Sequence, residues 1–157
     1  MAAPTSPVEM VVAALRAGGV EPEVRRFDEP VPTAAAAAAA LGCAVGAIAN
    51  SLVFDADGEP LLVLASGAHR VDTTKVAALV GAVRVRRATP EFVLAATGQE
   101  VGGVGPVGHP APLRTVVDTD LADHPRLWAG AGDHWTMFAA TYDELVRVTG
   151  GTPAAVG

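Results

Sequence analysis

The stretch SLVFDADGEPLLVLA, residues 51–65, carries the strongest structural signal of the chain. Two strongly apolar runs, 51–54 and 61–65, flank a polar segment that contains Asp57 and Gly58. Short apolar runs bounded by turn residues are typical of β-strands, and an Asp-Gly pair tolerates the positive φ angles of a tight turn. We therefore predict a β-hairpin. Because its strands are apolar at almost every position, both of its faces are expected to be covered.

Helix signals lie on both sides of the hairpin. Val8, Val11 and Leu15 recur at helical spacing, and the seven alanines of 34–40 have the highest helix propensity of any residue. We predict helices between Pro7 and Gly18, over 34–41, over 72–79, from Thr89 to near Gly98 and over 143–148, with one further helical turn over 45–50.

Apolar or alternating runs predict the remaining strands. They cover 23–27, 83–86 and 115–117, with two more near 127–128 and 137–138. Strands and helices are mixed without a regular β-α-β alternation. The sequence therefore predicts an α+β fold with a central mixed sheet flanked by helices.

Composition narrows the classes of function. A chain of 157 residues suits a single domain over 1–157. Only 4% of the residues are aromatic, which excludes a base-stacking platform, and the net charge of −6 disfavours tight binding to DNA or to long RNA. Recognition of one RNA end stays open.

The N-terminus and the cysteine content favour a cytoplasmic protein. The first residues lack a basic segment, and no window has the roughly 18 uncharged apolar residues of a membrane span. A single cysteine, Cys43, cannot form an internal disulfide. Its neighbours are apolar, so we interpret it as a small core residue.

A glycine-rich loop follows the predicted fourth helix. Residues 103–108, GVGPVG, match the G-x-G-x-x-G pattern of dinucleotide-binding folds, but Pro106, Pro110 and Pro112 forbid the helix which that site requires. We instead expect a sharply bent backbone whose N–H groups are free to bind an anion or an oxyanion. An ordinary structural turn is the alternative.

Other catalytic patterns are weak. Ser66, His69 and Asp72 are close in sequence, but Ser66 lacks the G-x-S-x-G context of a hydrolase nucleophile. The four histidines fall in different loops without metal-ligand spacing, so no metal and no cofactor are predicted. Asp118, Asp120 and Asp123 are expected to be caps or solvated charges.

Several ordered motifs resemble the YbaK/EbsC family of aminoacyl-tRNA deacylases, relatives of the editing domain of bacterial prolyl-tRNA synthetases. They are IANSLVF at 48–54, the hairpin, the segment 72–80 and GGVGPVG at 102–108. The resemblance spans about 8–150. It implies a strongly curved, barrel-like sheet and hydrolysis of the ester between a mischarged amino acid and the 3′-terminal ribose of tRNA. It also implies that the substrate's 2′-hydroxyl helps to position the water.

The family pattern carries over residue by residue. Gly103 and Pro106 match its G-x-x-P loop, and Ser51 matches the small hydroxyl of its I-x-K-S/T-L-V-F strand, whereas Asn50 stands in place of the lysine. An amide donates neutral hydrogen bonds, which are roughly half as strong as charge-assisted ones. The predicted catalytic residues are Asn50, Gly103, Gly105 and Pro106; the predicted substrate-binding residues are Ser51, Val104 and His69. The family's late acidic residue is not assigned, and Asp133 is only its neighbour.

The sequence leaves three hypotheses. The first is a trans-editing deacylase that removes a small amino acid from the 3′ end of tRNA, with an aminoacyl-tRNA synthetase as a second partner. The second is a binding module that keeps the pocket but lost hydrolysis with the lysine. The third is a scaffold protein within a synthetase complex.

Overall fold

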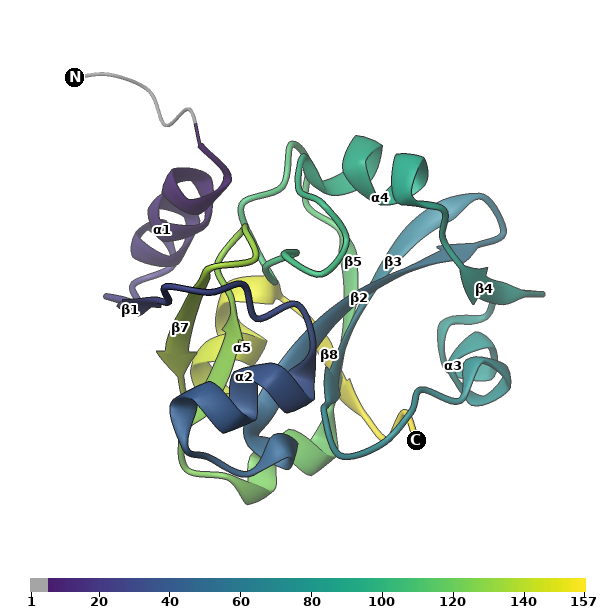
Figure 1. The fold of residues 1–157 in the computed structure, drawn as a ribbon. Helices are drawn as coiled ribbons and strands as arrows, with labels where there is room; N and C mark the ends of the chain where they lie inside the picture. The colour runs from purple at the N-terminus through teal and green to yellow at the C-terminus, as the bar shows by residue number, and fades with distance from the viewer. Residues whose placement is uncertain (1–5) are drawn as a thin grey trace.

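The structure is a computed structural model that describes residues 6–157 (Figure 1). Its α-helices are α1 (Pro7–Ala17), α2 (Ala34–Leu41), α3 (Thr73–Val80), α4 (Pro90–Thr97) and α5 (Tyr142–Thr149), and its 3-10 helices are η1 (Val45–Ala47) and η2 (Thr119–Asp123). Its strands are β1 (Glu23–Arg26), β2 (Ile48–Ala56), β3 (Glu59–Ser66), β4 (Val85–Arg87), β5 (Arg114–Asp118), β6 (Leu127–Gly130), β7 (Thr136–Ala140) and β8 (Thr152–Ala154).

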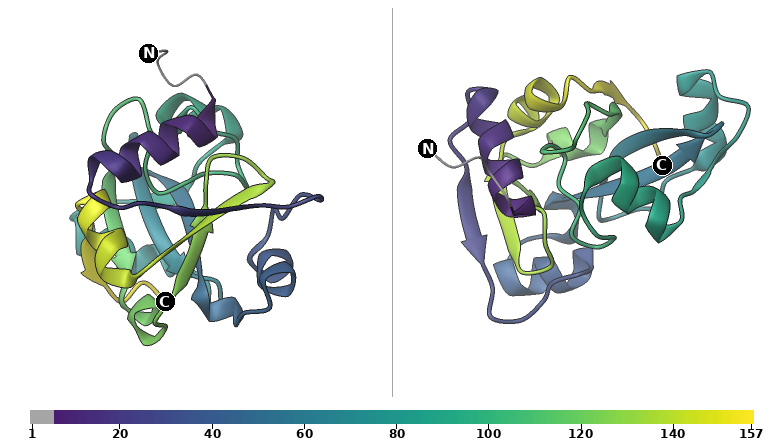
Figure 2. Two further views of the ribbon diagram at one scale, coloured as in Figure 1. Left: turned by 90° about the vertical axis from the view of Figure 1, so that its left-hand side faces the viewer. Right: turned by 90° about the horizontal axis from the view of Figure 1, so that it is seen from above.

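The strands form one mixed sheet. Their order is β1-β7-β6-β2-β3-β5-β8, and β4 also pairs with β2. The pairs β2/β6, β3/β5 and β5/β8 are parallel, and the hairpin β2/β3 is antiparallel. The α+β prediction is therefore confirmed. The two ends of this order, β1 and β8, do not pair with each other, so the sheet curls but does not close into a barrel (Figures 1 and 2).

Local sequence signals account for the hairpin and the helix boundaries. The turn between β2 and β3 places Asp57 at φ 53° and Gly58 at φ 92°, as the Asp-Gly pair predicts. Side chains of Ser6, Thr33, Asp72, Thr89 and Thr141 cap the five α-helices by accepting a backbone N–H of the first turn. Glycine in the left-handed conformation ends α2, α3, α4 and α5.

The core lies on both faces of the sheet. On β3, Leu62 and Leu64 belong to core clusters with α4 and with α1 and α5, whereas Leu61 and Val63 pack with α3. On β2, Ile48 packs with α2. We call the side of the sheet that carries Leu62 and Leu64 the α1 face. The opposite side, which carries Ile48, Leu61 and Val63, is called the α2 face. Alternate residues of a strand point to opposite faces, so one strand contributes side chains to the core on both faces of the sheet.

The structure corrects four predictions about elements. β2 begins at Ile48, so the helical turn expected over 45–50 is shortened to η1. The strand expected over 83–86 is β4 at Val85–Arg87, and β8 was missed because three residues with a proline carry no periodic signal. The middle of β2 is not fully covered: Leu52 is 37% exposed.

Two further observations concern targeting and the cysteine. Between residues 6 and 157, no helix combines the length and the apolar character needed to cross a membrane. Cys43 is half-buried and packs at the edge of the cluster that joins α2 to the sheet. It is therefore less buried than expected for a core residue.

Candidate active site

The sheet has a gap along β2. β3 occupies one edge of β2 from Ala49 to Ala56, so β6 and β4 must share the other edge. β6 pairs only with Ile48 and Ala49, and β4 pairs only from Phe54 to Ala56. Residues 50–53 therefore face no strand on that edge. A cavity of about 650 Å³ opens at this gap.

Backbone hydrogen-bonding groups point into the gap. The Ile48 carbonyl accepts a bond from Gly67 N, next to β3, whereas Asp57 N donates to the Arg84 carbonyl, next to β4. Backbone groups of successive strand residues point to opposite edges. The N–H and C=O groups of Ser51 and Val53 therefore face the cavity, as at an unpaired sheet edge.

Side chains of several elements close the cavity. It is lined by Val31, Pro32, Thr33, Ala34 and Ala37 around α2, all residues from Ile48 to Phe54, Arg87, Ala88, Pro90 and Val93 around α4, Val101, Gly102 and Val104 of the glycine-rich loop, and Gly130, Asp133, Thr136 and Met137. The structure thus places Asn50, Ser51 and Val104 on the wall of one cavity. The Asn50 carboxamide makes no hydrogen bond within residues 6–157 and is free to bind a ligand.

Two charged residues mark the cavity wall. Arg87 is exposed and has no ion-pair or hydrogen-bond partner in the described part of the chain. Asp133 accepts a hydrogen bond from Trp135 N at 2.9 Å and lies 3.8 Å from the Arg26 guanidinium. Neither residue was predicted as a site residue, because no local motif distinguishes it.

The glycine-rich loop does not present free N–H groups at the predicted positions. Gly103 N donates to the Glu100 carbonyl at 3.0 Å, and Gly105 N donates to Gln99 Oε1 at 2.7 Å. Both donors are thus already occupied. Pro106 does not line the cavity at β2 and instead lines a separate cavity of about 500 Å³ between the loop and α1.

Close packing explains two of the glycines. A Cβ atom on Gly103 would lie 2.8 Å from the backbone carbon of Asp133, and one on Gly105 would lie 2.9 Å from the Gly130 carbonyl oxygen. Side chains essentially never approach backbone atoms so closely. These glycines are therefore required because the loop packs backbone to backbone against residues 130–133.

Comparison with known proteins identifies the family. The profile of the aminoacyl-tRNA editing domain matches residues 28–148. The chain belongs to this family. A crystal structure named as a candidate trans-editing enzyme for prolyl-tRNA synthetase is 39% identical, with a TM-score of 0.90 over 98% of each chain.

The chain is also similar in sequence to two further proteins. The proline–tRNA ligase of Nitratidesulfovibrio vulgaris (strain DP4) is 41% identical over 81 residues, which cover 52% of this chain and 14% of the ligase. The uncharacterised protein YwhH of Bacillus subtilis (strain 168) is 29% identical over 126 residues, 80% of each chain. The editing domain therefore corresponds to a small part of the ligase and to most of YwhH.

Gln99 holds the glycine-rich loop of the editing domain in place. Its side chain is 2% exposed; it accepts from Gly105 N, and its Nε2 donates to the Val107 carbonyl at 3.4 Å. His109 Nε2 lies 2.8 Å from the Gly105 carbonyl, to which it donates. Burial lowers the pKa of His109, which favours a neutral imidazole in this role. Gln99 has no local sequence signal beyond its place beside the glycines.

His69 does not lie on the cavity wall of the editing domain. Its Nε2 contacts Asp118 Oδ2, and its Nδ1 lies 3.5 Å from Asp120 Oδ2. These ligand atoms lie within 4.8 Å of one another, which would suit a metal ion. However, Nε2 is already hydrogen-bonded to Asp118, and Nδ1 faces the exposed carboxylate of Asp120. Asp118 is therefore a buried partner of His69, and it also caps η2 by accepting from Asp120 N at 3.0 Å, so it is one of the expected caps and not a solvated charge.

The same region excludes a serine nucleophile. Ser66 Oγ donates to the Gly46 carbonyl at 3.0 Å and does not contact His69. Asp72 accepts from Lys75 N at the start of α3. The three side chains considered for a triad thus serve the local structure separately.

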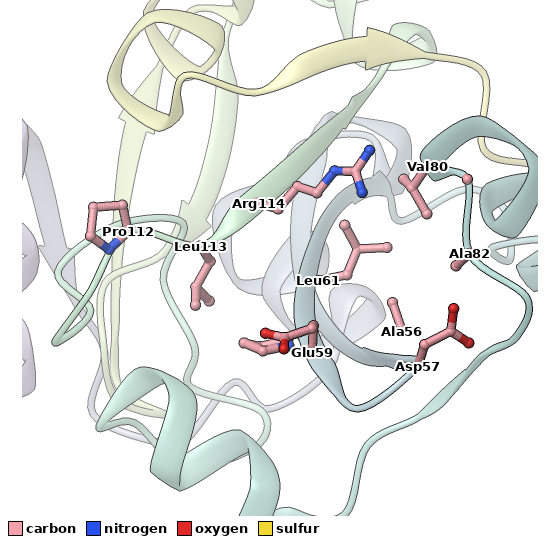
Figure 3. A pocket seen from close by; sticks show the side chains of 11 residues that line it. Ala56, Asp57, Glu59, Leu61, Val80, Ala82, Pro112, Leu113 and Arg114 are labelled. Atoms are coloured by element: carbon pink, nitrogen blue, oxygen red, sulfur yellow. The ribbon is translucent and has the colours of Figure 1, made fainter.

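Another pocket, of about 420 Å³, lies at the turn of the hairpin (Figure 3). Asp57 and Arg114 are among the residues around it (Figure 3). The Asp57 carboxylate accepts bonds from Val83 N at 2.8 Å and Arg84 N at 2.9 Å, which lower its pKa. None of the predicted site residues lines this pocket.

Proposed function

We propose that this editing domain is an aminoacyl-tRNA deacylase that hydrolyses the ester of a small mischarged amino acid at the 3′ end of tRNA. One observation carries the proposal: the free Asn50 amide lies in the same cavity as the unpaired edge of β2. The carbonyl oxygen of an ester becomes negative during hydrolysis and needs donors at that position. Asn50 and the unpaired N–H group of Ser51 or of Val53 supply such donors.

The reaction needs no side-chain nucleophile in this scheme. Water attacks the ester carbonyl carbon, the bond to the ribose oxygen breaks, and that oxygen takes up a proton. The substrate's own 2′-hydroxyl helps to hold the water, as the family resemblance implies. Gly103 and Gly105 contribute by letting the loop approach 130–133, which brings Val104 to the cavity wall.

The cavity is large enough for more than an amino acid. Ligand pockets commonly measure about 300–1,000 Å³, and this one measures about 650 Å³, which leaves room for the terminal adenosine as well. Its wall is mostly small or aliphatic, which favours a small amino acid. We propose the tRNA 3′ end as the main partner and an aminoacyl-tRNA synthetase as a transient second partner.

Substitution of Asn50 tests the proposal. We expect wild-type protein to deacylate at least one member of a panel of mischarged tRNAs, and Asn50→Ala to lower kcat/KM about a hundredfold, the usual cost of one oxyanion donor. Thermal melting checks that the variant is folded. Wild-type rates equal to the buffer control for the whole panel would refute the deacylase.

Asn50 itself motivates the second candidate, a binding module without turnover. In that case a non-hydrolysable aminoacyl-adenosine analogue would bind, no ester would be cleaved, and Asn50→Lys would introduce cleavage. Cleavage by the wild-type protein would exclude this candidate.

Arg87 is proposed to bind a phosphate near the tRNA end. Arg87 on β4 lies opposite Phe54 on β2 in the strand register. Phe54 is four residues from Asn50, which places their Cα atoms about 13 Å apart at the usual rise of a strand. A cation at that distance from the ester suits a backbone phosphate of the terminal nucleotides. We expect Arg87→Gln to raise KM for aminoacyl-tRNA about tenfold, in line with the loss of one charged hydrogen bond, and to leave cleavage of a phosphate-free aminoacyl-adenosine unchanged.

Arg84→Gln is the matched control, because Arg84 is also exposed and does not line the cavity. Kinetics at several salt concentrations measure both variants. An equal effect of the two substitutions would contradict a specific role for Arg87.

A further inference from the structure

Two buried hydroxyl groups in the described part of the chain lack any hydrogen-bond partner. They are Ser51 Oγ and Thr136 Oγ1, and each oxygen exposes less than 1 Å². Both residues line the cavity at the gap of β2. Thr136 is only 3% exposed. Every other buried side-chain nitrogen or oxygen within residues 6–157 has a partner, so the exceptions coincide with the proposed site.

The two hydroxyl-bearing residues lie on the same face of the sheet. Ser51 is two residues from Ala49 on β2, and Thr136 is two residues from Phe138 on β7. Ala49 and Phe138 belong to one core cluster on the α1 face. Because side chains alternate along a strand, Ser51 and Thr136 point to that face as well. Both residues therefore line the cavity from the same face of the sheet.

An unpaired buried hydroxyl disfavours folding, because it has lost its bonds to water without replacement. Bulk water does not reach either oxygen directly. A turn about the Cα–Cβ bond to another staggered rotamer redirects the hydroxyl. A hydrogen bond from this hydroxyl to a ligand then replaces the hydrogen bonds to water that were lost on folding. It therefore contributes more to binding than a hydrogen bond at an exposed site.

We propose that Ser51 and Thr136 select an amino acid that carries a side-chain hydroxyl. This inference rests on the proposed function and specifies its substrate class: esters of serine and threonine are preferred over the alanyl ester. An alanyl methyl group leaves both protein hydroxyls unpaired. A site with polar groups of this kind discriminates against an analogue that lacks the hydroxyl.

The first test compares the same tRNA charged with serine, threonine or alanine. We expect kcat/KM for the seryl or threonyl ester to exceed that for the alanyl ester at least tenfold. Equal or inverted rates would overturn the inference while leaving the deacylase intact. If no ester is cleaved, the deacylase fails instead. In that case the affinities for non-hydrolysable seryl- and alanyl-adenosine analogues are compared. The inference then requires the seryl analogue to bind at least tenfold more tightly.

The second test uses Thr136→Val, which keeps the shape and removes the hydroxyl. We expect the seryl-to-alanyl ratio to fall at least fivefold and the melting temperature to stay equal or rise, because no internal bond is lost. Thr115→Val is the matched control. Thr115 is also buried, but its Oγ1 donates to the Leu113 carbonyl at 2.9 Å. It should lower the melting temperature and leave the ratio unchanged.

The two readouts separate selectivity from a structural role. A Thr136→Val variant that melts earlier and keeps its seryl-to-alanyl ratio would assign a structural role to this hydroxyl and overturn the inference. Ser51→Ala should lower the same ratio, since Ser51 also lines the cavity with an unpartnered hydroxyl.

Discussion

Gly103→Ala is expected to lower deacylation at least tenfold and to destabilise the protein by about 1–3 kcal/mol, the usual cost of overpacking. The added methyl group would lie 2.8 Å from the backbone carbon and 2.9 Å from the Cα of Asp133. Backbone atoms cannot rotate away as a flexible side chain can. The substitution must therefore separate the glycine-rich loop from residues 130–133, and both segments form the cavity wall.

Kinetics on aminoacyl-tRNA and thermal or urea unfolding measure the two effects. Gly58→Ala is the control: Gly58 has φ +92° and open space at its Cβ position, so alanine causes backbone strain without a clash. It should lower stability and leave the activity of the folded protein unchanged. Normal activity and stability of Gly103→Ala would show that the loop and residues 130–133 do not need this close contact.

Gln99→Met is expected to destabilise the protein by about 2–4 kcal/mol, because it leaves two buried backbone groups unpaired. Methionine has nearly the same length as glutamine but cannot accept from Gly105 N or donate to the Val107 carbonyl. We also expect kcat/KM to fall about tenfold, the effect of roughly 1.4 kcal/mol, since Gly105 follows the cavity residue Val104 directly.

Denaturant unfolding and deacylation kinetics test this prediction. Glu100→Met is the control, because Glu100 is the exposed neighbour of the buried Gln99. This control should behave like the wild-type protein in both assays. An unchanged unfolding free energy of Gln99→Met would contradict the prediction. It would mean that other groups or water form hydrogen bonds with Gly105 N and the Val107 carbonyl.

Local physical chemistry is visible in the sequence for the hairpin and the helices. Asp57 and Gly58 predict the turn because they tolerate positive φ, and Thr33, Asp72 and Thr89 predict helix starts because they cap the first turn. The ordered motifs at 48–54, in the hairpin, at 72–80 and at 102–108 together suggested the editing-domain family, which the match to residues 28–148 confirms.

The sequence located only part of the candidate site. Asn50 and Ser51 were predicted from the family motif and lie at the cavity, whereas Pro106 and His69 lie elsewhere. Arg87, Asp133 and Thr136 were not predicted. They come from separate elements, so no spacing along the chain relates them to Asn50.

Backbone conformation is determined by neighbours in sequence, and for that reason turns, caps and most helix boundaries of this chain could be derived from its residues alone. The open edge of β2 could not. It exists because β6 stops pairing at Ala49 and β4 starts pairing at Phe54, and both registers depend on contacts between distant segments. Tertiary structure alone therefore decided that Asn50, the backbone of Ser51 and Val53, and Thr136 line one cavity.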